Sequence, residues 1–157
     1  SGRTAVLLAT AARVGALVAD HPRDLIEAVT SFGQNYGMAF QIIDDVLDLI
    51  ATDAQLGKPA GNDLIEGVYT LPVIRALAGS NGEELRDLLD GSLDKASRDQ
   101  AISIIRSADA LPSTVETAVY YTNQARNALN DLAPTPAANT LHMTCDLLLE
   151  QTNLASR

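Results

Sequence analysis

The stretch from Arg23 to about Ile50 restricts the fold most strongly, because apolar side chains recur there at helical spacing and no proline interrupts them. This is long for a helix of a soluble protein, and Gly33 and Gly37 inside it allow a kink or a join near Gly33. Val, Ile and Thr form no alternating runs, and aromatic residues make up only 4% of the chain. The sequence therefore predicts an all-α fold.

Further helices are expected on both sides of this segment. Thr4 to Ala19 is apolar nearly all round and rich in small residues, which predicts a buried helix that neighbours can approach closely. Gly57 to Pro72 is crowded with glycine and proline and predicts a functional loop. A Ser113–Glu116 capping box and a Thr135-Pro136 pair predict the starts of the last two helices. The helices expected after the loop are 72–78, 83–90, 94–107, 113–132 and 136–155.

Size and charge narrow the function classes. The chain has 157 residues, 46% of them hydrophobic, which predicts one globular domain over 1–157. Its net charge of −9 repels phosphate backbones, so we expect no nucleic acid as a partner.

No apolar run approaches the ~18 residues of a transmembrane segment. Cys145 is the only cysteine and cannot form an internal disulfide, which favours a cytoplasmic location. Because the chain begins at Ser1 without Met, we expect a processed, tagged or truncated form.

An acidic face marks the end of the long helical segment. At ~100° per residue, Gln41, Asp44, Asp45 and Asp48 fall within an arc of about 100°. The carboxylates repel one another, and no Lys or Arg lies between residues 33 and 57 to relieve them. A cation bound by oxygen ligands alone would relieve them, and such ligands suit Mg²⁺. The alternative is a solvated acidic stripe without a ligand.

Several short motifs lie before and after the aspartate face in the sequence. An AFQ-I segment precedes the DDxxD helix, an LGK turn follows it, and DL-x-EG and TLP segments come next. The chain also opens on Arg3-Thr4-Ala5-Val6-Leu7, and its end from Tyr120 to Arg157 is helical in pattern. Together these features resemble the second half of the trans-isoprenyl diphosphate synthase (polyprenyl synthetase) family. The motifs stand here as Ala39-Phe40-Gln41-Ile42, Asp44-Asp45-Val46-Leu47-Asp48, Leu56-Gly57-Lys58, Asp63-Leu64, Glu66-Gly67 and Thr70-Leu71-Pro72.

The resemblance implies a helical bundle of the isoprenoid synthase type, of which this chain is the C-terminal part. It also implies a prenyltransferase that joins an allylic diphosphate to isopentenyl diphosphate, head to tail and in trans geometry, with Mg²⁺ as cofactor. In intact form it would be a cytoplasmic homodimer. By the resemblance, Asp44, Asp45 and Asp48 bind the metal. The resemblance also implies that Arg3 and Lys58 contact the allylic diphosphate.

The remaining site residues implied by the resemblance surround the reacting carbon. Thr4 and Gln41 would steady the developing cation with oxygen dipoles. Phe40 would form a pocket wall, and its alternative is a place in the core.

Two departures from the family pattern are visible. Val68 stands where the family has the lysine of an EGK motif, and the first half of the pattern, with its own aspartate-rich motif, is absent. We therefore expect this chain alone to be inactive, with apolar faces that cause self-association or hold an N-terminal piece. One alternative is a non-catalytic or regulatory half-length subunit of a heteromeric synthase. A generic helical interaction module is another.

Overall fold

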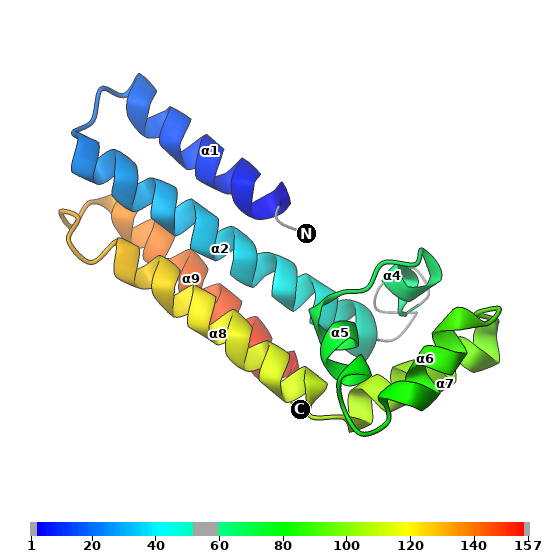
Figure 1. Cartoon of the computed structure of the whole chain (residues 1–157). Helices are drawn as coiled ribbons and strands as arrows, with labels where there is room; N and C mark the ends of the chain where they lie inside the picture. The colour runs from blue at the N-terminus through cyan, green and yellow to red at the C-terminus, as the bar shows by residue number, and fades with distance from the viewer. Residues whose placement is uncertain (1–2, 52–59, 156–157) are drawn as a thin grey trace. The chain divides into compact units, whose positions relative to one another are not determined.

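A computed structural model describes residues 3–51 and 60–155. The described residues form helices without any strand, which confirms the all-α prediction (Figure 1). The helices are α1 (Arg3–Val18), α2 (Arg23–Ile50), α4 (Asn62–Ile65), α5 (Leu71–Leu77), α6 (Gly82–Asp90), α7 (Lys95–Ser107), α8 (Ala110–Ala128) and α9 (Pro136–Ala155).

The described residues divide into two compact units. The first contains residues 3–43 and 116–155, and the second contains residues 44–115. Helices α2 and α8 each contribute residues to both units. The first unit is built from α1, α9 and the greater parts of α2 and α8, whereas the short helices α4 to α7 belong to the second.

Helix α1 packs on α2 through backbone contact that only glycine permits. A Cβ atom on Gly37 would lie 2.5 Å from the Cα atom of Ala5, and one on Gly33 would lie 2.7 Å from the carbonyl oxygen of Leu8. Ala5, Ala9 and Ala16 form the buried stripe of α1. The two glycines therefore serve close helix packing, and α2 runs from Arg23 to Ile50 without a join.

The expectation of a buried first helix is wrong for this chain. Only three alanines of α1 are buried, whereas Leu7 is 69% and Val18 is 83% exposed. Helix α1 is apolar on most sides, as the sequence pattern predicts, but the described residues cover only one of its faces. The sequence pattern records that a side chain is apolar and does not record which neighbour covers it.

Helices α2, α8 and α9 share an apolar core in the first unit. Phe32, Ala125, Leu129 and Cys145 form it, and the ring of Tyr36 stacks on Phe32 with the centroids 5.4 Å apart. Cys145 is fully buried, and this burial raises the pKa of its thiol.

One of the two predicted helix starts is confirmed. The Thr135 hydroxyl accepts a hydrogen bond from the backbone N–H of Ala138 at 3.1 Å, and Pro136 begins α9. The Ser113–Glu116 capping box is wrong, because α8 already begins at Ala110. The Ser113 hydroxyl instead donates to the carbonyl of Ala110 at 3.1 Å, which is an interaction within the first turn.

The packing of α1 on α2 predicts opposite effects for two glycine substitutions. Gly37→Ala should lower the free energy of unfolding by about 1–3 kcal/mol, because its Cβ atom meets the backbone of Ala5. Gly15→Ala should raise it by about 0.5–1 kcal/mol, because a Cβ atom there meets nothing within 4 Å and alanine favours the helix. Urea unfolding followed by circular dichroism measures both values. Equal effects of the two substitutions would contradict the packing.

The buried thiol predicts slow chemical labelling. Native Cys145 should react with a maleimide far more slowly than the same residue in urea, because the reacting species is the thiolate and burial disfavours it. Labelling followed by mass spectrometry gives the two rates. Similar rates in both conditions would show that Cys145 is accessible in the native state.

Candidate active site

The carboxylates at the end of α2 differ in their exposure. Asp44 is exposed, whereas Asp45 and Asp48 are each only 5% exposed. The alternative of a merely solvated acidic stripe is therefore wrong for Asp45 and Asp48. Burying a carboxylate is costly unless other groups compensate its charge, so this end of α2 is built for interactions and not for solubility alone.

A loop is attached to the buried Asp48. The backbone N–H of Asp63 donates to its Oδ2 atom at 3.4 Å, and the N–H of Gly61 donates to its carbonyl oxygen at 2.9 Å. Gly61 has a φ of 68°, and a Cβ atom there would lie 2.7 Å from Cδ1 of Ile102 on α7. Glycine is thus favoured at this position, because other residues adopt its left-handed backbone conformation only at a cost.

An arginine far away in the sequence binds the end of α2. The Nε and Nη2 atoms of Arg106 donate to the carbonyl oxygen of Leu49 at 2.8 and 2.5 Å. A cation at a helix C-terminus is favourable, and α2 has no basic residue of its own in its last turn. Sequence reasoning missed Arg106 because the residue lies 57 positions from Leu49, and only the fold brings the two together.

The aspartate oxygens at the end of α2 fit a magnesium ion that takes most of its ligands from water or phosphate. Asp44, Asp45 and Asp48 offer oxygen atoms only, which Mg²⁺ prefers. Within 3–51 and 60–155, no three His, Cys, Asp or Glu side chains form a group that could hold a metal. Mg²⁺ commonly takes one or two protein carboxylates and completes its shell with water and phosphate oxygens, and these aspartates suit that use.

The structure brings together two of the residues expected near the reacting carbon. The Thr4 hydroxyl on α1 donates to Oε1 of Gln41 on α2 at 2.9 Å. Arg3 is exposed at the start of α1. Phe40 is 45% exposed, so the alternative of a core aromatic is wrong, and its role as a pocket wall stays a prediction.

The segment between α2 and α5 carries the two other positions of interest. Lys58, expected to contact a diphosphate, lies outside the described residues. Val68, which stands in the place of the family lysine, is 48% exposed, and its N–H donates to the carbonyl of Asp63 at 2.8 Å.

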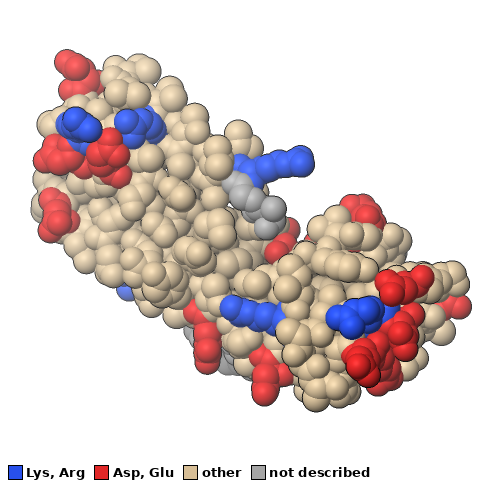
Figure 2. Space-filling view, viewed as in Figure 1, with Lys and Arg blue, Asp and Glu red and all other residues tan. Residues whose placement is uncertain are grey.

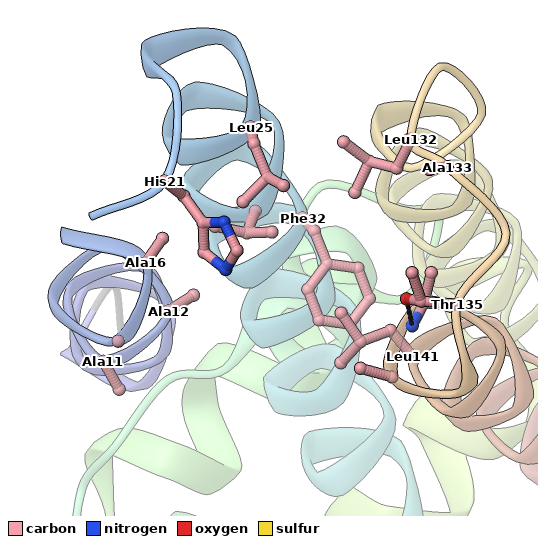
Figure 3. Close-up of a pocket in the computed structure, with 14 residues that line it drawn as sticks. Ala11, Ala12, Ala16, His21, Leu25, Phe32, Leu132, Ala133, Thr135 and Leu141 are labelled. Carbon is pink, nitrogen blue, oxygen red and sulfur yellow. Dashed lines mark hydrogen bonds between the residues drawn. The ribbon is translucent and has the colours of Figure 1, made fainter. Parts of the chain in front are cut away.

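A separate apolar cavity lies in the first unit. Its volume is about 390 Å³, and Figure 3 shows alanines of α1 facing Leu25 and Phe32 of α2, with Leu141 of α9 nearby. None of the predicted site residues lines it. Its polar side chains are His21 and Thr135, and the Thr135 hydroxyl already caps α9. The cavity therefore offers an apolar surface without chemistry of its own.

The described helices give no candidate for a membrane span. Each of them is too short or too polar to cross a bilayer.

Comparison with known proteins identifies the family. The sequence model described as "Polyprenyl synthetase" matches residues 1–106. Heptaprenyl diphosphate synthase component 2 of Geobacillus stearothermophilus is 37% identical over 130 residues, which cover 83% of this chain and 41% of that protein. The short chain isoprenyl diphosphate synthase of Methanothermobacter thermautotrophicus is 33% identical over 151 residues, or 95% of this chain and 46% of that protein.

The fold is also that of the family. The crystal structure of geranylgeranyl pyrophosphate synthase from Corynebacterium glutamicum, complexed with calcium and isoprenyl diphosphate, matches with a TM-score of 0.85 and 31% identity. The match covers 96% of this chain and 48% of that one, so the chain spans about half the length of its relatives. Both comparisons confirm the resemblance seen in the motifs, and this chain belongs to the polyprenyl synthetase family.

Proposed function

We propose that this chain is the part of a prenyl diphosphate synthase that carries the second aspartate-rich motif. The intact enzyme would join an allylic diphosphate to isopentenyl diphosphate, head to tail and in trans geometry. The observation that carries the proposal is the place of Asp44, Asp45 and Asp48 on α2 of a chain that belongs to this family. Relatives named as geranylgeranyl and decaprenyl diphosphate synthases support the transferase class.

The aspartates would hold Mg²⁺, with exposed Asp44 as the principal ligand and Asp45 and Asp48 as further ligands or as its supports. Bound Mg²⁺ would supply positive charge that neutralises the departing diphosphate. Asp48 also fixes the loop through the N–H groups of Gly61 and Asp63. The site would thus combine one accessible carboxylate with two whose surroundings set their position.

Residues of α1 and α2 would bind and steer the allylic substrate. Arg3 and Lys58 would contact its diphosphate as fixed positive charges. The Thr4 hydroxyl and the Gln41 amide, held together at 2.9 Å, would place oxygen dipoles beside the developing allylic cation. Phe40, exposed on α2, would help to exclude water from it.

A heteromeric subunit is the second candidate function. Two relatives, from Geobacillus stearothermophilus and Bacillus subtilis, are named component 2 of a heptaprenyl diphosphate synthase, a name that points to a partner component. Val68 in place of the family lysine also favours a specialised subunit. In either case the chain alone would be inactive, because it spans less than half of these relatives. Homodimer formation and a cytoplasmic location stay predictions.

Activity tests require the rest of the enzyme. We call the part of the Corynebacterium glutamicum synthase that this chain does not match the complementary segment. A chimera that joins the complementary segment to this chain provides an intact enzyme in which residues of this chain can be changed one at a time.

In that chimera, Asp44→Ala should lower kcat/KM for prenyl transfer by at least about a hundredfold, because a group that stabilises departing charge is lost. Asp24→Ala removes another exposed carboxylate, from the other end of α2, and should change kcat/KM by less than about twofold. Radiolabelled isopentenyl diphosphate incorporation measures both rates. Near-normal turnover of the Asp44→Ala chimera would refute the assignment of Asp44.

A further inference from the structure

The last turn of α2 is held by residues from outside the helix. The last four carbonyl groups of an α-helix have no partner within it, so they need donors from elsewhere. In α2, the carbonyl oxygen of Asp48 accepts from the backbone N–H of Gly61 at 2.9 Å. The carbonyl oxygen of Leu49 accepts from Nε and Nη2 of Arg106 at 2.8 and 2.5 Å. The helix end that carries Asp48 therefore depends on residues that come much later in the chain.

Helix α7 contacts both chain segments that meet at Asp48. Ile102 and Arg106 lie four residues apart in α7, so their side chains lie on the same face of that helix. Arg106 binds the end of α2, and Cδ1 of Ile102 fills the space beside Gly61. The N–H groups of Gly61 and Asp63 in turn donate to Asp48. One face of α7 thus contacts both the end of α2 and the segment 61–63 that binds it.

Positive charge is scarce in this chain, which makes the position of Arg106 informative. Lys and Arg number 11 against 20 Asp and Glu, and acidic surface is more prominent than basic surface on the face shown in Figure 2. Arg13, Arg98 and Arg126 each pair with an Asp or Glu side chain. Arg106 instead directs two nitrogen atoms at one backbone carbonyl. An arginine used in this way holds the main chain in place.

We propose that Arg106 is a positioning residue for the diphosphate site. By holding the Leu49 carbonyl it keeps the last turn of α2 intact, and with it the Asp48 carboxylate and the segment 61–63. Without Arg106 that carbonyl would have to take water as its partner, and helix ends fray readily. Asp48 lies in this last turn, whereas Asp44 lies one turn earlier. The inference rests on the proposed function for the identity of the ligand, but the contacts that it describes require no ligand.

Positioning and charge predict opposite effects for the loss of Arg106. A cation near metal-binding carboxylates repels the metal, so loss of its charge alone would strengthen Mg²⁺ binding. Loss of a residue that supports a metal ligand from behind typically weakens metal binding by about 10- to 100-fold. In the chimera, Arg106→Met should therefore weaken Mg²⁺-dependent binding of inorganic pyrophosphate at least about tenfold. Arg106→Lys keeps the charge and can donate one hydrogen bond to the carbonyl, so it should bind within about threefold of the unaltered chimera.

Calorimetric titration of inorganic pyrophosphate, with and without Mg²⁺, measures these affinities. Arg86→Met is the matched control, because it removes the same charge from an exposed position on α6 and should change binding by less than about twofold. Unchanged or tighter Mg²⁺-dependent binding by the Arg106→Met chimera would overturn the proposal. Asp44→Ala, measured alongside, separates the two proposals. If it weakens binding and Arg106→Met does not, the role of Arg106 alone fails, whereas the proposed function fails as well if neither change weakens binding.

Hydrogen exchange of the metal-free chimera tests the contacts without ligand or turnover. Arg106→Met should speed exchange at least about tenfold in peptides that cover 44–51 and 60–66, because the helix end and the segment bound to it open together. Peptides from α8 and α9 should exchange as before, and Arg86→Met should match the unaltered chimera throughout. An even rise over all peptides would show that Arg106 merely stabilises the fold. That result, or unchanged exchange in 44–51, would overturn the proposal.

Discussion

The burial of two carboxylates near the C-terminus of α2 is the constraint on which the candidate site depends. Asp45 and Asp48 are buried at the end of a helix whose dipole is negative there. The backbone N–H of Asp63 donates to the Asp48 carboxylate, while the N–H of Gly61 and the Arg106 side chain donate to the carbonyl oxygens of Asp48 and Leu49. The loop, the left-handed glycine and α7 are thereby tied to one helix end, and Asp44 is left accessible beside them.

A second constraint is the glycine contact between α1 and α2. It fixes α1 with its alanines inward, which aligns Thr4 with Gln41 and leaves apolar side chains such as Leu7 and Val18 exposed. The same packing thus positions two predicted site residues and creates a surface that the described residues leave uncovered. The relatives that this chain matches are about twice as long as the chain itself. Under the proposed function, a site that handles a carbocation would have to exclude water.

The sequence predicted the features that local chemistry controls. Periodicity predicted the longer helices but not the short α4, which lies in the segment expected to be a loop. The Thr135-Pro136 pair predicted the start of α9, and the motif from Ala39 to Asp48 indicated the family. Features that depend on tertiary contact were missed or mistaken. The Ser-x-x-Glu pattern at Ser113 occurs inside a helix because a serine hydroxyl can also bond to the preceding turn. Arg106, the unequal exposure of the aspartates and the exposed face of α1 follow from packing that no local pattern reports.

Calorimetric titration of inorganic pyrophosphate into the chimera, with and without Mg²⁺, tests the central claim most directly. If the aspartate face of α2 is a metal-dependent diphosphate site, Asp44→Ala should weaken the Mg²⁺-dependent part of pyrophosphate binding at least about tenfold and leave any metal-independent part unchanged. Unaltered Mg²⁺-dependent binding in the Asp44→Ala chimera would contradict the account, because Asp44, Asp45 and Asp48 would then be an acidic helix end without a ligand.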